Sequence, residues 1–294
     1  MKNILLTGAT GFLGSSLARH WVNSGHQVSA LVRSTTNTAR IQDILDDIQL
    51  IYCSSDDDVI GAIARVAPDY IVHTACSYGR AGESPVEVFD VNVRLGLLLL
   101  EGVRLLDKEV VFVNTGTILD PAVGIYAMSK QSFSALGALQ VKQANSGLKF
   151  INISLQHMYG PGDDKSKFTA YVISSCLKNV ESLKLTSGVQ KRDFVFIEDV
   201  VSAYDAILSH GKHMADFEDI EVGSGVSVPV REFVELVHSL TASKTLLEFG
   251  TVPYRTNEAM LFEADISRMR SFGWVPATSL VEGIKITVNK DLLR

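Results

Sequence analysis

The stretch Asn3-Ile-Leu-Leu-Thr7, followed by Gly8-Ala-Thr-Gly11-Phe-Leu-Gly14, decides the fold of this chain. The first five residues are mainly apolar and predict a short buried strand, and apolar residues recur at helical spacing afterwards. Gly8 suits a tight turn, Gly11 lets the backbone approach a phosphate closely, and Gly14 allows close helix packing. Three glycines also fit an ordinary turn, so this interpretation depends on the rest of the chain.

Strand-like and helix-like patterns alternate through the first half of the chain. Apolar runs predict strands at 27–32, 49–53, 69–74, 109–114 and 148–153. This alternation predicts an α/β fold with a doubly wound parallel (Rossmann) sheet. Shorter apolar runs in the second half indicate a smaller C-terminal lobe that binds substrate. We expect the Rossmann domain to comprise residues 1–155 and 190–214, and the lobe to comprise residues 156–189 and 215–294.

The end of the second predicted strand bears on the choice of dinucleotide. In dinucleotide-binding sheets an acidic residue here binds the ribose 2′-hydroxyl of NAD. Val32 stands at this place, and Arg33-Ser34 follows, which suits a 2′-phosphate. The sequence therefore predicts NADP(H) over NAD(H), with an ordinary surface role for Arg33 as the alternative.

Length, charge and cysteine content indicate a cytoplasmic enzyme-sized chain. Its 294 residues carry a net charge of −6, which argues against non-specific binding to nucleic acid or an acidic membrane. Its three cysteines, Cys53, Cys76 and Cys176, have neither metal spacing nor a disulfide framework, so we expect reduced thiols and no metal. Gly8 and Gly11 interrupt the first apolar run too early for a signal peptide. No apolar run approaches the length of a membrane span.

A second motif, Tyr126-Ala-Met-Ser-Lys130, carries the candidate chemistry. If residues 126–145 form a helix, the phenol and the ammonium lie on one face, roughly 5–6 Å apart at Cβ. That geometry suits proton transfer. Alone, the same spacing more often marks a solvated helix face or a buried tyrosine beside a lysine that reaches solvent.

Five motifs together resemble a known family. They are the N-terminal glycine pattern, Tyr126-x-x-x-Lys130, His157-Met-Tyr-Gly-Pro-Gly162, Arg192-Asp-Phe194 with Asp199-Val200, and Phe272-Gly-Trp-x-Pro276. Their order is that of the extended short-chain dehydrogenase/reductases, which act on nucleotide sugars. More narrowly, the chain resembles the CDP-abequose and CDP-paratose synthases, which reduce the 4-keto group of a CDP-3,6-dideoxyhexulose with NADPH. This resemblance is carried by His157-Met-Tyr-Gly-Pro-Gly-Asp163, Lys167-Phe168, Gln190-Lys-Arg-Asp-Phe194, Glu248-Phe-Gly250 and Asn257-Glu258.

The resemblance implies a catalytic trio of Thr115, Tyr126 and Lys130. Tyr126 would protonate the forming alkoxide as general acid, and Lys130 would lower its pKa and hold the nicotinamide ribose. Thr117 is the alternative to Thr115, and either threonine would otherwise cap a backbone group at the strand end. Gly116-Thr117 stands where dehydratases of the family carry an Asp-Glu pair, so dehydration is not expected.

The resemblance also implies two sets of binding residues. The expected cofactor-binding residues are Gly8, Thr10, Gly11, Phe12, Leu13, Gly14, Arg33, Ser34, Thr74, Ala75, Tyr126 and Lys130. The expected substrate-binding residues are Tyr78, Arg80, Thr117, His157, Arg192 and Arg255.

Several of these residues also suit a structural role. For Arg192 or Arg255 an ion-pair role is equally open, and Tyr78 and Arg80 also suit an ordinary surface loop. His157 and Ser154 replace Asn and Arg of many relatives, and a structural role for His157 is favoured, as it is for His73. Asn92 would fix the central strand near the site.

The expected function is thus NADPH-dependent reduction of the 4-keto group of a nucleotide-activated deoxyhexulose, of the CDP-3,6-dideoxyhexose type used in surface polysaccharide such as O-antigen. Two alternatives stay open: a nucleotide-sugar 4-epimerase with tightly bound NAD, and a non-catalytic NADPH-binding regulator. Relatives commonly dimerise through the tyrosine helix, so a homodimer is expected. The apolar stripe of Phe133, Leu136 and Leu139 would serve that interface or the core equally well.

Overall fold

The computed structural model describes residues 1–143, 147–256 and 258–293, and the chain divides into two compact units. Unit 1 comprises residues 1–154 and 204–220, and unit 2 comprises residues 155–203 and 221–294. Motif order predicts that the chain returns to the first unit at residue 190. It returns instead at Tyr204, because β9 (Lys191–Phe196) pairs with strands of unit 2.

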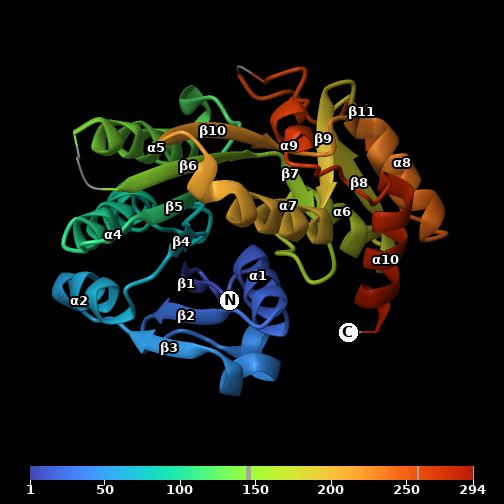
Figure 1. The fold of residues 1–294 in the computed structure, drawn as a ribbon. Helices are drawn as coiled ribbons and strands as arrows, with labels where there is room; N and C mark the ends of the chain where they lie inside the picture. The colour runs from blue at the N-terminus through green and yellow to red at the C-terminus, as the bar shows by residue number, and fades with distance from the viewer. Residues whose placement is uncertain (144–146, 257, 294) are drawn as a thin grey trace. The chain divides into compact units, whose positions relative to one another are not determined.

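The centre of unit 1 is a sheet with the strand order β10-β6-β5-β4-β1-β2-β3 (Figure 1). The pairs from β1 to β6 are parallel, which confirms the doubly wound prediction. The strands are β1 (Asn3–Thr7), β2 (Gln27–Val32), β3 (Gln49–Tyr52), β4 (Tyr70–His73), β5 (Val110–Thr115), β6 (Leu148–Leu155) and β10 (Phe217–Val222). The central strands β1, β4 and β5 read as nearly continuous apolar runs because helices cover both faces, whereas β10 carries three acidic residues.

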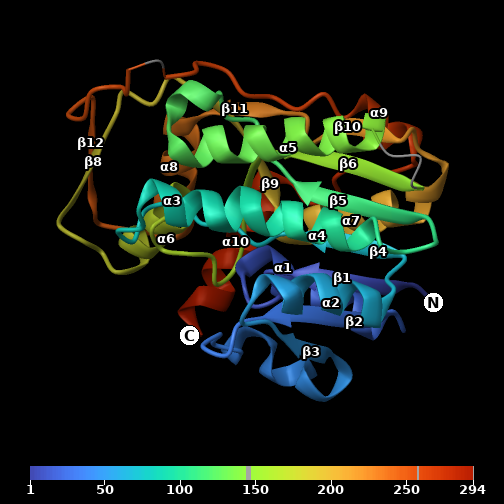
Figure 2. The same ribbon diagram turned by 90° about the vertical axis from the view of Figure 1, so that its left-hand side faces the viewer.

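Helices flank this sheet on both faces (Figures 1 and 2). One face carries α2 (Asp56–Val66), α4 (Leu95–Val103) and α5 (Ile125–Gln143), and the other carries α1 (Phe12–Asn23) and the end of α7 (Ile197–His210). The shorter elements of this unit are the 3-10 helices η1 (Ala39–Asp47), η3 (Pro121–Val123) and η4 (Gly211–His213), the helix α3 (Pro85–Phe89) and the π-helical η2 (Asp90–Arg94). The core on the α4 side is aliphatic with a cluster of phenylalanines, Phe112, Phe133 and Phe150.

Unit 2 is built around a small sheet of order β11-β9-β7. In it, β7 (His157–Tyr159) runs parallel to β9, and β11 (Ser227–Pro229) runs antiparallel to β9. A separate parallel pair joins β8 (Ser182–Leu185) and β12 (Leu246–Phe249). The helices are α6 (Phe168–Leu177), α8 (Val230–Leu240), α9 (Ser267–Ser271), α10 (Leu280–Leu292) and the first part of α7. Within the described ranges no helix is long and apolar enough to cross a membrane.

Candidate functional site

The glycine turn between β1 and α1 is held in a conformation that only glycine adopts easily. Gly8 has φ +72°, and its carbonyl accepts a hydrogen bond from the Gly11 N–H at 2.9 Å. A Cβ on Gly8 would lie 2.7 Å from the backbone nitrogen of Ala75, and a Cβ on Gly14 would lie 2.0 Å from the Gly8 carbonyl oxygen. The turn therefore packs between the loop after β4 and the first turn of α1.

The start of α1 fits an anionic group. Gly11 is its N-cap and offers no side-chain hydrogen bond, so the first N–H groups of this 12-residue helix stay available. The first turn carries no acidic side chain. A Cβ on Gly11 would meet only the Gly8 carbonyl oxygen, at 3.2 Å, so space lies open above the backbone. Together with the helix dipole, these features suit the pyrophosphate of a dinucleotide.

The end of β2 presents a cation rather than a carboxylate. Val32 is buried, whereas Arg33 and Ser34 are exposed. A tight turn fixes the backbone of this segment, because the Arg33 N–H donates to the Thr36 Oγ1 at 2.9 Å and the Thr36 N–H donates to the Arg33 carbonyl at 2.9 Å. Arg33 is thus a solvent-exposed cation at this strand end.

Asn92 joins the loop after β4 to the tyrosine helix. It lies in η2, where the Leu95 N–H donates to the Asp90 carbonyl in a π-helical turn. The Asn92 Oδ1 accepts from the Ser77 N–H at 2.7 Å, and its Nδ2 donates to the Ser77 carbonyl at 2.8 Å and to the Ser129 Oγ at 2.9 Å. Ser129 lies on α5 between Tyr126 and Lys130, so this network sets the loop against the candidate catalytic pair.

Tyr126 lies at the start of α5, among side chains that hold its ring and its hydroxyl. The ring stacks on Tyr78 with 4.8 Å between centroids. Burial and the negative charge that Cys76 carries when deprotonated raise the pKa of the Tyr126 phenol, and hydrogen bonds with Thr117 and Tyr78 oppose part of that rise. In the ligand-free protein Tyr126 is therefore a protonated phenol at neutral pH, in the form required of a proton donor.

Lys130 follows one helical turn after Tyr126 and is only 2 % exposed. Its Nζ has no hydrogen-bond partner among the residues that the structure describes. Burial lowers the pKa of this ammonium, and a nearby Cys76 charge opposes the shift. A buried ammonium without a partner is unfavourable in an unliganded protein, so this geometry fits a ligand that supplies hydroxyl acceptors.

The two candidate threonines have different partners. The Thr115 Oγ1 lies 2.7 Å from the hydroxyl of Tyr204, a buried residue on α7. Thr117 forms the hydrogen bond with Tyr126, and its carbonyl accepts from the Gln131 Nε2 at 2.9 Å. Sequence reasoning missed Tyr204, and no local signal marks it, because it lies 89 residues after its partner.

The remaining predicted residues of unit 1 lie around this centre. Thr74 donates to the Thr7 carbonyl at 2.8 Å, and the Ala75 N–H donates to the Thr7 Oγ1 at 3.3 Å. Arg80 is exposed and places its guanidinium 5.3 Å from the centroid of the Tyr78 ring.

His73 is fully buried against the Thr7 Oγ1 at 2.7 Å, and burial and the Lys130 charge lower its pKa from 6.5 to about 3. Among the glycine-loop residues, Thr10 and Phe12 are partly exposed and Leu13 is buried.

Unit 2 holds its own cluster of predicted substrate residues. Arg192 forms an ion pair with Glu258, and its guanidinium lies 4.9 Å from the centroid of the Phe262 ring. The His157 ring lies 5.9 Å from the same phenylalanine ring, and its Nδ1 is buried without a partner in the described part of the chain. Burial and Arg192 lower the pKa of His157 from 6.5 to about 4. Arg255 is exposed. Asn257 lies outside the described residues.

Asp193 fixes the strand that carries Arg192. Its carboxylate accepts from the Ser224 N–H at 2.7 Å, the Ser224 Oγ at 2.6 Å, the Gly225 N–H at 2.9 Å and the Ala264 N–H at 3.1 Å. These contacts tie β9 to two loops that are distant in sequence. The Arg192-Asp-Phe194 motif singled out this aspartate in the sequence, but it did not indicate which groups donate hydrogen bonds to it.

Comparisons with known proteins agree with this architecture. Residues 4–223 match the model of the NAD dependent epimerase/dehydratase family. The chain is 33% identical to a CDP-abequose synthase of Salmonella muenchen, over 97% of this chain and 96% of that protein. It is 26% identical to a UDP-glucose 4-epimerase of Mycolicibacterium smegmatis, over 97% and 96%.

Among solved structures, a UDP-glucose 4-epimerase of Thermus thermophilus in complex with NAD superimposes with a TM-score of 0.82. The alignment covers 98% of each chain at 22% identity, so it supports the fold alone. The family model covers well over half of the chain, and it begins at the strand that precedes the glycine turn. This protein belongs to the NAD dependent epimerase/dehydratase family of extended short-chain dehydrogenase/reductases.

Proposed function

We propose that this protein reduces the 4-keto group of a nucleotide-activated deoxyhexulose with NADPH. The observation that carries the proposal is the pair on α5: a protonated Tyr126 phenol and a buried Lys130 ammonium that lacks a partner among the described residues. A helix start suited to pyrophosphate and a cation at the end of β2 support a phosphorylated dinucleotide beside this pair. When bound, that dinucleotide supplies the hydride.

The chain's own residues supply the proton and the positioning. Tyr126 donates its phenolic proton to the substrate oxygen as negative charge develops there, and so becomes a phenolate. The Lys130 ammonium favours the phenolate and holds the ribose hydroxyls. Thr117 holds the Tyr126 hydroxyl and is our choice for the threonine that also contacts the substrate carbonyl. Thr115, which is paired with Tyr204, then supports the strand end.

Arg33 and Ser34 are proposed to select NADPH by binding its 2′-phosphate. We expect Arg33→Ala to weaken NADPH binding while leaving NADH binding unchanged, because only the former ligand carries a charge for Arg33 to contact. Titration of intrinsic fluorescence with each dinucleotide gives both dissociation constants. Equal affinities in the wild-type protein would contradict this choice of cofactor.

The residues proposed to bind substrate form a separate set in each unit, beginning with unit 1. Tyr78 and Arg80 face the sugar from the loop after β4, and Thr117 contacts its carbonyl. His157, Arg192 and Arg255 contact the nucleotide, with the arginines on the diphosphate. Arg192 is paired with Glu258, so a diphosphate there must share this guanidinium with a carboxylate, whereas Arg255 is exposed.

Reduction is favoured over epimerisation by two observations. Relatives named CDP-abequose synthase align over nearly the whole chain, and the strand end at Val32 lacks the carboxylate that suits NAD. The corresponding product is a CDP-3,6-dideoxyhexose for surface polysaccharide such as O-antigen. A nucleotide-sugar 4-epimerase with tightly bound NAD is the second candidate, because relatives with that activity in their names align over 97% of the chain. We place the reaction in the cytoplasm, where cysteines stay reduced.

The decisive experiment offers 4-keto sugars carried on CDP, dTDP, UDP and GDP to the purified protein with NADPH. Consumption of the reduced dinucleotide with one of them supports the proposal. Tyr126→Phe should bind NADPH normally and lower turnover by about 10²–10⁴-fold. Co-purified NAD without net consumption of NADPH would favour the epimerase. NADPH binding with no oxidation by any substrate would favour a regulator.

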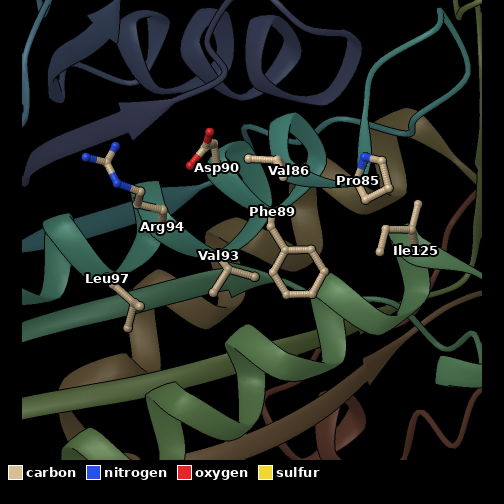
Figure 3. A pocket seen from close by; sticks show the side chains of 8 residues that line it. All are labelled: Pro85, Val86, Phe89, Asp90, Val93, Arg94, Leu97 and Ile125. Atoms are coloured by element: carbon tan, nitrogen blue, oxygen red, sulfur yellow. The ribbon is translucent and has the colours of Figure 1, made fainter.

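We also propose that the enzyme is a homodimer that pairs through the face formed by α3, η2, α4 and the start of α5. A cavity of about 370 Å³ opens on this face, and Figure 3 shows the side chains around it. Its lining is mainly apolar: Pro85, Val86, Phe89, Asp90, Val93, Arg94, Leu97 and Ile125. The sequence also indicated an apolar stripe on α5. Two of its residues, Phe133 and Leu136, pack in the core, and the third, Leu139, is exposed.

Val86 is 69 % exposed at this cavity, and Leu105, 68 % exposed, provides a matched control away from it. Val86→Glu should shift the molar mass by light scattering from dimer to monomer, whereas Leu105→Glu should not. A dimer that survives Val86→Glu would argue against this face.

A further inference from the structure

The loop that follows β5 leaves the sheet one residue after the strand ends. Gly116 is still anchored, because its N–H donates to the Ile153 carbonyl at 2.8 Å and a Cβ on it would lie 2.6 Å from the Asn152 Oδ1. The residues between Gly116 and η3 belong to no strand or helix, yet they include Thr117, which forms the hydrogen bond with Tyr126. The placement of that threonine therefore needs support from outside the sheet.

Gln131 supplies this support from α5. Its Nε2 donates to the Thr117 carbonyl at 2.9 Å and to the Leu119 carbonyl at 3.3 Å, so one amide group holds both ends of the turn. Only the amide nitrogen of a glutamine can donate to carbonyl oxygens, so the orientation of this side chain follows from its partners. Gln131 directly follows Lys130 on the helix that also carries Tyr126. The loop is thereby attached to the helix of the candidate catalytic pair.

The Thr117 side chain is oriented within this turn. Its Oγ1 accepts from the Leu119 N–H at 3.3 Å, and the residue is only 6 % exposed. A hydroxyl has one proton and two lone pairs, so after this contact the proton and one lone pair remain for Tyr126 and a substrate carbonyl. Because Gln131 holds the carbonyls of both residues in this contact, loss of its amide would release the turn that aims the hydroxyl at the phenol.

The other candidate threonine is attached to a different helix. Thr115 still pairs with Ile153 of β6, and its Oγ1 lies 2.7 Å from the hydroxyl of Tyr204 on α7. The end of α7 and helix α5 cover opposite faces of the sheet (Figure 1). The two attachments therefore draw the two threonines toward opposite faces, with Thr117 on the side of α5.

We propose that Gln131 is a positioning residue whose side-chain amide sets the Thr117 hydroxyl against the Tyr126 phenol. Gln131 acts through Thr117, because it donates to backbone carbonyls rather than to a reacting group. The consequence for turnover rests on the proposed function, whereas the placement of the hydroxyl does not. One measurement without turnover and one with turnover keep the two apart.

The first measurement is the NMR signal of the Tyr126 Cζ, in protein labelled with carbon-13 at that position of tyrosine. The signal is assigned by its loss in Tyr126→Phe, and its chemical shift reports hydrogen bonding at the phenol oxygen. We expect Thr117→Val and Gln131→Met to move it in the same direction. Gln140→Met, the same change later on the same helix, should leave it in place. A Tyr126 signal that stays in place in Gln131→Met would overturn the proposal.

The second measurement is turnover with the keto sugar that the wild-type protein reduces. Gln131→Met should lower kcat roughly ten-fold and leave the dissociation constant of NADPH unchanged, because a misplaced contact at the reacting atoms slows the chemical step. In a Thr117→Val background the same change should have no further effect, since Gln131 acts through that hydroxyl. Equal effects of Gln131→Met in the two backgrounds would also overturn the proposal.

Folding and function are controlled separately. Thermal unfolding verifies that each variant is folded. Gln131→Glu keeps the length and shape of the side chain but places a carboxylate before the two carbonyls, so it should move the Tyr126 signal and lower kcat at least as much as Gln131→Met. If Gln131→Met does not fold, Gln131→Glu decides by the same criteria. Absence of turnover with every keto sugar would contradict the proposed function, and the Tyr126 signal would then decide the role of Gln131.

Discussion

Each unit buries a cation beside a neutral histidine, but in the described part of the chain only one of these cations has an ion-pair partner. In unit 1, Lys130 lies near His73, and its Nζ has no hydrogen-bond partner among the described residues. In unit 2, Arg192 lies near His157 and is paired with Glu258. Because removing a charge from water is costly, we infer that a ligand completes the surroundings of an ammonium that has no hydrogen-bond partner among the described residues. A compensated guanidinium is already part of the folded structure.

The largest expected effect is on turnover and comes from Lys130 in unit 1. Lys130→Met should lower kcat by about 10²–10⁴-fold, because the ammonium proposed to favour the Tyr126 phenolate is lost. It should not lower the melting temperature, since methionine replaces a buried charge with an apolar side chain of similar length. Rates of NADPH consumption and thermal unfolding measure the two quantities.

Lys142→Met on the same helix is the control for this variant and should leave both quantities unchanged. A strongly destabilised Lys130→Met protein would show that the ammonium has a structural partner after all, which would remove the contrast between the two units.

The next largest effect is expected in unit 2, where removing Arg192 leaves the Glu258 carboxylate without its ion-pair partner. Arg192→Met should lower the free energy of unfolding by about 2–4 kcal/mol, because Glu258 remains largely buried without its counter-charge. Adding Glu258→Gln should restore part of that loss, which a double-mutant cycle in urea measures. The exposed neighbour Lys191→Met is the control. Additive effects of the two changes would indicate that the ion pair contributes nothing.

The smallest expected effect is on the pH dependence of the free energy of unfolding, through His157 in unit 2. The pKa of His157 is lowered from 6.5 to about 4, so the folded protein keeps this ring neutral while the unfolded chain takes up a proton below 6.5. The associated stability is present above pH 6.5 and is lost as the pH falls toward 4. At pH 5 the loss amounts to about 2 kcal/mol. His157→Asn should therefore reduce the difference in unfolding free energy between pH 7 and pH 5 by that amount. An unchanged pH dependence would mean that the ring is protonated in the folded state.

Local patterns were sufficient to predict the core of unit 1. The apolar run before Gly8 and the helical spacing after Gly14 are short-range signals, and the predicted strands at 49–53, 69–74, 109–114 and 148–153 are found within two residues of those limits. Helix α5, which carries Tyr126 and Lys130, begins one residue before the predicted start. Such features depend on residues that are neighbours in the chain.

Long-range partners could not be predicted in the same way. The distinction between Thr115 and Thr117 depends on Tyr204, which reaches one hydroxyl from a distant helix. The role of Asp193 depends on loops 31 and 71 residues later. The stripe on α5 was equally compatible with core and interface, and only the position of the neighbouring phenylalanines places Phe133 inside. Each of these choices is made by tertiary packing.

The π-helical turn at Asp90–Arg94 has a consequence for how the site is built. Such a turn holds one residue more than an ordinary helical turn, so it acts as a single-residue insertion. This insertion sets how the preceding helix α3 is rotated about the helix axis relative to α4. Deleting Val91 would return the segment to regular winding and rotate the preceding helix by about 100°. The amide of Asn92 would then leave both Ser77 and Ser129, and the loop would lose its alignment with the Tyr126 phenol although every candidate catalytic side chain was still present.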